Sequence, residues 1–235
     1  KEGADILEMD LFKSIDGEIF VFHTGMEPAQ LDRHIKVESM TSEEIRRLRL
    51  CNVDLTETFL PLNTFEEVLE HLKNKCILNL DRSIKILDDV MKIVNKHNMA
   101  DQVLLKSDPS DASLKMVETF APKVDYMPIF MEEDVASEKI ENMNINYIGA
   151  ELVFKSESSS IAQDSYIDMM HKKGRILWGN SIVYSSRVPL AAGHNDDISL
   201  TGDPEDGWGW LAKKGFDIIQ TDWTHHCVNY LRNRY

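Results

Sequence analysis

The sequence predicts an α/β fold and, within that class, a TIM (β/α)8 barrel. Short apolar runs alternate with helical patterns along the 235 residues, and such alternation is typical of parallel strands joined by helical crossovers. The length is close to the roughly 250 residues that such a barrel usually needs. A doubly wound open sheet is the competing architecture, but the sequence has no G-x-G-x-x-G or Walker phosphate loop to favour it.

The predicted strands are short runs rich in Ile, Val, Leu, Phe or Tyr, bounded by polar residues. They are Ala4–Leu11, Glu18–His23, Cys76–Leu80, Gln102–Lys106, Asp125–Ile129, Tyr147–Phe154, Arg175–Trp178 and Phe216–Thr221. Asp16-Gly17 between the first two runs predicts a tight hairpin turn, inserted after the strand that carries Glu8 and Asp10. About seven barrel strands then remain, so we expect the first strand and helix of the barrel to lie upstream of this sequence.

The predicted helices have recognisable starts and faces. Thr41-Ser-Glu-Glu44 and Thr64-Phe-Glu-Glu67 both fit a capping box. Apolar residues at 87, 90, 91 and 94 predict one buried helix face. The remaining predicted helices are Asp111–Phe120, Ala136–Asn142, Gln163–Lys173, Asp206–Lys214 and Trp223–Asn233.

We expect one domain over residues 1–235, with a small insertion at about 24–63 on the carboxyl face of the barrel. The formal net charge of −14 argues against nucleic-acid binding through the overall field. No apolar run approaches the roughly 18 residues of a transmembrane segment. Three well-separated cysteines predict reduced side chains, mostly buried, and no disulfide framework.

Carboxylates at strand ends form the main candidate site, since the carboxyl ends of barrel strands line the active site. Glu8 and Asp10 are two residues apart and point to the same side of one strand. Asn79 and Asp81 share a side of the next barrel strand in the same way. Carboxylates gathered on one buried face repel unless a cation lies between them. Oxygen ligands of this kind indicate Ca²⁺ or Mg²⁺ bound by Glu8, Asp10 and Asp81.

Other chemistry-bearing side chains follow the same rule of position. His23 ends the returning hairpin arm and is a candidate general acid or base, although such a residue is more often structural. Lys106 is either a solvated strand end or an anchor for an anionic group. Trp178, Asn180 and Trp223 lie at the ends of later strands, where the tryptophans would either contact substrate or pack the rim.

The segment from Gly193 to Trp210 is expected to be a long polar loop whose acidic residues are mostly solvated.

These residues resemble the core signature of the glycerophosphodiester phosphodiesterase (GDPD) family. Gly3-Ala-Asp-Ile-Leu-Glu-Met-Asp10, then Asp16-Gly17, then Val21-Phe-His23 are similar to the family's G-A-D-x-I-E-x-D, x-D-G and V-x-H-D. Leu60-Pro-Leu-Asn-Thr-Phe-Glu-Glu-Val-Leu69 is similar to P-T-L-E-E-V-L. Trp178-Gly-Asn180 and Thr221-Asp-Trp223 are similar to W-T-V-N and T-D-x-P, so the resemblance covers nearly the whole chain.

The resemblance implies a TIM barrel that hydrolyses glycerophosphodiesters to sn-glycerol 3-phosphate and an alcohol, with Ca²⁺ or Mg²⁺ as cofactor. It implies metal ligands at Glu8, Asp10 and Asp81, with His23 as the acid that protonates the leaving alcohol. It also implies a small-molecule glycerophosphodiester as the substrate. Lys106, Trp178, Asn180 and Trp223 are the expected substrate-binding residues.

The sequence departs from the family pattern in places. The opening H-R-G motif does not occur, and we expect it in a longer protein of which this chain is part. His23 is followed by Thr24 rather than Asp, and the family's E-I-K is replaced by Asp81-Arg-Ser83, leaving Lys106 or Arg82 to supply the missing charge.

Three alternatives stay open. The first is a catalytically silent barrel that binds a phosphodiester or a protein partner. The second is a relative of the spider-toxin phospholipases D. The third is an unrelated barrel enzyme such as an aldolase, with Lys106 forming a Schiff base. The headgroup alcohol, the oligomeric state and the localisation are left open by the sequence.

Overall fold

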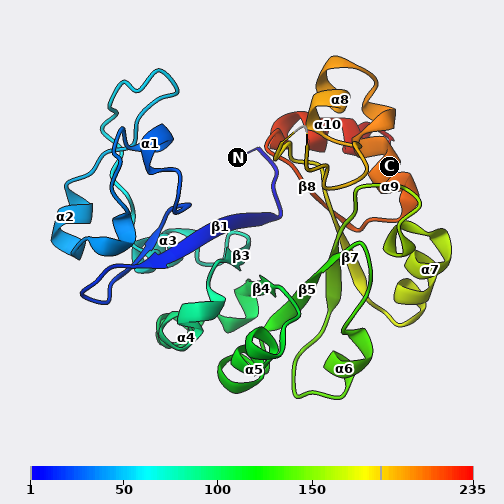
Figure 1. Cartoon of the computed structure of the whole chain (residues 1–235), viewed down its shortest axis with the longest axis horizontal. Helices are drawn as coiled ribbons and strands as arrows, with labels where there is room; N and C mark the ends of the chain where they lie inside the picture. Colours follow the sequence, from blue (N-terminus) through cyan, green and yellow to red (C-terminus); the bar gives the residue numbers. More distant parts are fainter. Residues whose placement is uncertain (1, 186, 235) are drawn as a thin grey trace. The chain divides into compact units, whose positions relative to one another are not determined.

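A computed structural model describes residues 2–185 and 187–234. Figure 1 shows their helices and strands. The strands are β1 (Ile6–Lys13), β2 (Ile19–Val21), β3 (Ile77–Asp81), β4 (Val103–Ser107), β5 (Asp125–Met131), β6 (Gly149–Val153), β7 (Ile176–Asn180) and β8 (Ile218–Gln220). The α-helices are α1 (Glu27–Gln30), α2 (Ser42–Arg46), α3 (Phe65–Leu72), α4 (Leu87–Lys96), α5 (Asp111–Phe120), α6 (Ser137–Glu141), α7 (Asp164–Lys172), α8 (Asp196–Thr201), α9 (Trp208–Lys214) and α10 (Thr224–Arg234).

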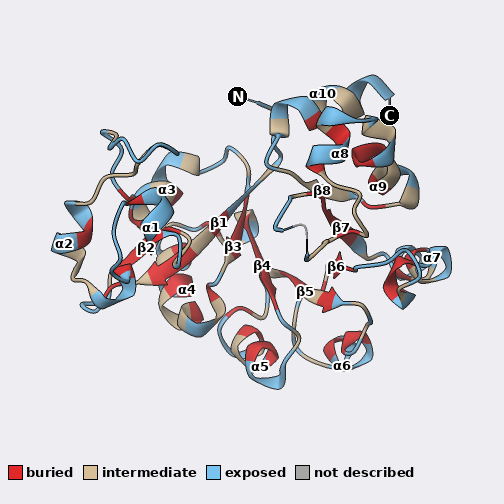
Figure 2. Cartoon of the chain, turned by 45° about the horizontal axis from the view of Figure 1, so that its top comes forward, coloured by how far each residue is buried: buried red, intermediate tan, exposed pale blue. Residues whose placement is uncertain are grey.

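The predicted α/β fold is confirmed element by element. Each predicted strand overlaps an observed one, and α5 covers the predicted residues 111–120. Both predicted capping boxes are present, with Thr41 and Thr64 each accepting from the backbone of the glutamate three residues on. The apolar face expected on α4 is buried, and Figure 2 shows helices buried on one side and exposed on the other. Closure into a full barrel and the single-domain organisation stay predictions.

The chain divides into two compact units. The first unit comprises Ile6–Leu105 and Lys115–Val124, and the second comprises Lys1–Asp5, Lys106–Leu114 and Asp125–Tyr235. We describe each by itself.

The sheet of the first unit is built around β1, which has two different partners. Its first half pairs in parallel with β3, from Ile6 opposite Ile77 to Asp10 opposite Asp81. Its second half pairs antiparallel with β2 around the Asp16-Gly17 turn, and β3 pairs in parallel with β4. The residues after the hairpin pack on it through a small apolar core: Phe12, Phe20, Phe22, Leu31, Val37, Ile45 and Leu62. This core fixes the segment that carries α1 and α2.

The second unit contains the parallel strands β5 to β8, paired in chain order. Most residues of β5, β6 and β7 are buried, whereas the three residues of β8 are partly exposed. Since a strand covered on both faces needs apolar residues at successive positions, continuous runs rather than alternation predicted these strands.

The segment from Gly193 to Trp210 is not the solvated loop that the sequence suggested. Asn195 caps α8 by accepting from the Ile198 backbone N–H (3.0 Å). Asp196 is 1% exposed and is an exception to the prediction that the acids of this segment are mostly solvated. The other aspartates of the segment are exposed, as expected.

The three cysteines are free, but only Cys227 is buried, whereas Cys51 and Cys76 are partly exposed. Burial and the nearby Asp196 charge raise the pKa of the Cys227 thiol to about 12. No helix in the described ranges has both the length and the apolar character required to cross a membrane.

Candidate functional site

The register of β1 and β3 gathers the predicted carboxylates. Glu8 lies opposite Asn79 and Asp10 opposite Asp81, so all four side chains share one face of the sheet. Glu8, Asp10 and Asp81 each place a carboxylate oxygen within 4.8 Å of the others. This hard-oxygen donor set fits a divalent cation such as Ca²⁺ or Mg²⁺.

The surroundings of Asp10 disfavour its charged form. Burial raises the pKa of Asp10 above its ordinary value because desolvation disfavours the charged form. The Asp81 charge adds to the shift, and the Arg82 guanidinium opposes it through its charge and its hydrogen bond. A bound cation would relieve the same repulsion.

Arg82 meets these groups from the end of β3. Its Nε lies 3.0 Å from Asp10 Oδ1, and its Nη2 lies 2.9 Å from His23 Nε2. Nη1 donates to the Thr24 carbonyl (3.3 Å) and to Thr24 Oγ1 (3.2 Å). The backbone of Arg82 has a φ of +53°, a left-handed conformation that only a few per cent of non-glycine residues adopt.

His23 reaches the group because the hairpin arm returns beside β1. The Phe22 backbone N–H donates to the Asp10 carbonyl (3.0 Å), which places the next residue beside the carboxylates. A guanidinium has only donors, so His23 Nε2 accepts from Arg82. The other ring nitrogen, Nδ1, is buried and has no hydrogen-bond partner among the described residues.

Asn79 lies on the carboxylate face and is fully buried. Neither its amide oxygen nor its amide nitrogen has a hydrogen-bond partner within residues 2–185 and 187–234. Each buried polar group without a hydrogen-bond partner costs about 1–3 kcal/mol of stability. A polar ligand that hydrogen-bonds to the Asn79 amide would remove this cost.

A cavity of about 370 Å³ lies in the segment after the hairpin. It is lined by Thr24, Gly25, Glu27, Pro28, His34, Ile35, Lys36 and Glu38. Thr24 therefore lines the cavity and also contacts Arg82. The cavity is mixed in character, with both acidic and basic side chains at its wall.

The remaining predicted residues belong to the second unit, where Lys106 is already paired. Its Nζ lies 2.6 Å from Glu151 Oε2, with both side chains buried, and 3.8 Å from the centre of the Trp178 ring. Asn180 donates to Glu151 Oε1 (3.2 Å). Trp178 donates from its indole to Gln220 (3.0 Å). The solvated-end reading of Lys106 was therefore wrong.

The structure brings together Lys106, Trp178 and Asn180 but leaves Trp223 about half exposed, in contact with His226. The sequence reasoning missed Glu151 and Gln220. An acid inside the apolar run 149–153 was the available signal, since a glutamate in a buried strand is rarely unpaired.

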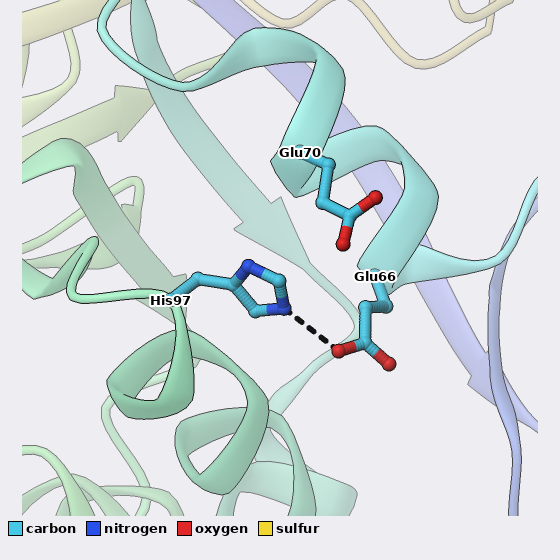
Figure 3. Close-up of side chains that lie close together, drawn as sticks. All are labelled: Glu66, Glu70 and His97. Atoms are coloured by element: carbon cyan, nitrogen blue, oxygen red, sulfur yellow. Dashed lines mark hydrogen bonds and ion pairs between the residues drawn. The ribbon is translucent and has the colours of Figure 1, made fainter.

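A second group of side chains that could bind a metal ion lies between α3 and the end of α4. Figure 3 shows Glu66 and Glu70 on successive turns of α3 with the His97 ring facing them. His97 Nε2 lies 2.7 Å from Glu66 Oε1, and Lys96 Nζ lies 2.5 Å from the same oxygen. Lys96, then His97, lowers the pKa of Glu66. Because a lysine already neutralises this carboxylate, the group is an ion-pair network that joins two helices.

Comparisons with known proteins bear on the fold. A glycerophosphoryl diester phosphodiesterase from Parabacteroides distasonis superimposes with a TM-score of 0.74, at 18% identity, over 97% of this chain and 75% of that one. The glycerophosphodiester phosphodiesterase of Thermotoga maritima gives 0.67 at 19% identity, over 99% and 87%. The chain has the glycerophosphodiester phosphodiesterase fold. The resemblance stated from the sequence motifs is confirmed at this level.

Three further comparisons gave the following results. A phosphodiesterase from Oleispira antarctica, whose structure contains the product sn-glycerol-3-phosphate, gives a TM-score of 0.67 at 15% identity, over 98% of this chain and 86% of that one. Residues 126–231 match a family model described only as a domain of unknown function. No curated protein sequence matches the chain.

Proposed function

We propose that the chain is a metal-dependent phosphodiesterase that hydrolyses glycerophosphodiesters to sn-glycerol 3-phosphate and an alcohol. The observation that carries the proposal is the approach of Glu8, Asp10 and Asp81 within 4.8 Å, on the face of a GDPD-type sheet. His23 supports it, since its contact with Arg82 puts it beside the same carboxylates.

Glu8, Asp10 and Asp81 would hold Ca²⁺ or Mg²⁺. A bound divalent cation supplies charge neutralisation at the phosphoryl oxygens and orients the attacking hydroxyl. Asn79 shares the face of these residues and has a buried amide that suits a polar ligand.

His23 would give its proton to the oxygen of the leaving alcohol as the phosphorus–oxygen bond breaks. It must first lose the bond from Arg82 and take up a proton from solvent at Nε2, because an Nε2 that accepts a hydrogen bond has no proton to donate there. The cavity beside Thr24 would receive the alcohol group, since Thr24 also contacts Arg82. The roles in substrate binding predicted for Lys106, Trp178, Asn180 and Trp223 stay predictions.

The test is hydrolysis of glycerophosphocholine by the full-length protein, after EDTA treatment and restoration of Ca²⁺ or Mg²⁺. We expect release of sn-glycerol 3-phosphate only with metal. His23→Ala should reduce kcat by roughly 10²–10⁴-fold, the usual contribution of a positioned acid. His71→Ala is the matched control, since His71 is an exposed histidine on α3 of the same unit.

Equal losses in the two histidine variants would contradict the role of His23. Absence of turnover on a panel of glycerophosphodiesters would remove the enzymatic proposal. It would leave the catalytically silent barrel as the better account.

A further inference from the structure

Arg82 contacts a candidate metal ligand and the candidate acid with a single guanidinium group. We propose that Arg82 is the phosphate-binding residue of this site, held on Asp10 and His23 until metal and substrate arrive. This inference rests on the proposed function and adds to it a residue that the family motif does not contain at this position.

The backbone explains how the side chain reaches the site. On a continuing strand, Arg82 would point to the face opposite Asp81. Instead the strand ends, the Arg82 backbone N–H donates to Asp81 Oδ1 (2.6 Å), and φ is +53°. The left-handed turn directs the guanidinium back across the carboxylate face.

The hydrogen bonds of Arg82 leave capacity for an anion. A guanidinium has five N–H donors in a planar fork. Asp10, His23 and the two oxygens of Thr24 take four of them. The side chain is 44% exposed, so a phosphate can approach the N–H that remains on Nη2. Loss of the bond to His23 when substrate arrives would free a second N–H on Nη2 for another phosphate oxygen.

Charge makes a local cation necessary. Three carboxylates around one divalent cation retain one net negative charge, and the chain as a whole carries −14. A phosphodiester anion would be repelled by such a site. Arg82 cancels the remaining charge where the phosphate must lie, between the metal ligands and His23.

This charge comes neither from Ser83, which occupies the position of the family's lysine, nor from Lys106, the other candidate cation. Ser83, at the position of the family's lysine, is fully buried, and its hydroxyl donates to the Leu80 carbonyl (2.8 Å). Lys106 is neutralised by Glu151 at 2.6 Å. Arg82, in contrast, directly contacts Asp10, a candidate metal ligand.

The proposal predicts opposite effects on two ligands, which a purely structural arginine would not produce. Calorimetric titrations would measure Ca²⁺ alone, and then sn-glycerol 3-phosphate at saturating Ca²⁺. In Arg82→Ala we expect Ca²⁺ to bind about tenfold more tightly, because a competing positive charge is removed from Asp10. We expect sn-glycerol 3-phosphate to bind about 10–100-fold more weakly, because charge-assisted hydrogen bonds are lost.

Two further variants sharpen the test. Arg82→Lys keeps the charge without the fork, so its Ca²⁺ affinity should stay near wild type while phosphate binding falls by an intermediate factor. Arg47→Ala removes an exposed arginine that pairs with Glu43 on the surface of the same unit, and should change both affinities less than twofold.

Weaker Ca²⁺ binding or unchanged sn-glycerol 3-phosphate binding in Arg82→Ala would overturn the proposal, as would a wild-type protein that binds neither ligand. Turnover is measured separately. A protein that shows both binding effects but no hydrolysis would retain the role of Arg82 and lose the proposed function.

Discussion

Asp196 has a structural role that its sequence context does not suggest. It lies in a segment rich in glycine and acids, yet its carboxylate is buried among donors. Ser181, Trp208 and Thr221 donate to Oδ1 at 2.8, 2.7 and 2.7 Å. The Asp222 backbone N–H donates to Oδ2 at 3.0 Å. One carboxylate thus joins α8, α9 and the ends of β7 and β8.

Replacing this carboxylate should destabilise the protein strongly. Asp196→Ala leaves several buried donors without an acceptor, and each bond to a charged group is worth about 1.5–3 kcal/mol. We expect the free energy of unfolding to fall by about 3 kcal/mol or more, measured by urea denaturation followed by circular dichroism. Asp197→Ala, at the exposed neighbouring position, should cost less than about 1 kcal/mol. Similar losses in both variants would contradict the role of Asp196.

The candidate site shows what residue spacing can and cannot predict. Glu8 and Asp10 were predictable because alternation along a strand places residues two apart on one face. Asp81 followed from the same rule on a neighbouring strand. The orientation of Arg82 depends on one backbone angle, and the pairing of Lys106 depends on a glutamate 45 residues away. The spacing of neighbouring residues therefore predicts neither the orientation of Arg82 nor the partner of Lys106.

At the scale of elements, capping and burial made most boundaries predictable. Threonine and glutamate three residues apart fix the starts of α2 and α3 through two reciprocal hydrogen bonds. The first helix, α1, has only four residues and no side-chain cap, so it left no periodic signal. For α8 a signal existed, since Asn195 followed by two aspartates is typical of a helix start.

The hairpin and α2 are linked by one aspartate of the turn. Asp16 Oδ1 accepts from Ser14 Oγ (2.7 Å) and from the Ser42 backbone (2.9 Å), and Oδ2 accepts from Ser42 Oγ (2.7 Å). These bonds, led by that from Ser14, lower the pKa of Asp16 to about 2. The ionised carboxylate is therefore favoured in the folded protein.

This link predicts a pH-dependent contribution to stability. A carboxyl group whose pKa is depressed by folding stabilises the protein above its unfolded pKa of about 3.9. The contribution is lost as the pH falls through the folded pKa of about 2. The urea midpoint of wild type should therefore exceed that of Asp16→Asn at pH 6, and the gap should narrow towards pH 2.5. In a Ser42→Ala background, the difference in urea midpoint caused by Asp16→Asn should be smaller at pH 6 than in the wild-type background. A constant gap across this range would refute the link.

At the scale of the molecule, the fold was predictable with little sequence identity. The superimposed phosphodiesterases share only 15–19% of their residues with this chain. Apolar runs nevertheless predicted the positions of the eight strands. A strand that is covered on both faces needs apolar residues at successive positions, and this need leaves a signal in the sequence. Closure of a barrel depends on contacts between segments far apart in sequence. Periodicity within a segment does not encode those contacts.

The net charge of −14 predicts how salt should affect substrate choice. A negative field repels an anionic phosphodiester and leaves a zwitterionic one almost unaffected. Screening shortens the range of this field from about 30 Å at 0.01 M salt to about 8 Å at 0.15 M. The kcat/KM for anionic glycerophosphoglycerol, divided by that for zwitterionic glycerophosphocholine, should therefore rise over this interval. The zwitterion serves as an internal control for effects of salt on the fold or the metal. A ratio that falls with salt would show that local attraction by Arg82 extends further than the repulsion by the whole molecule.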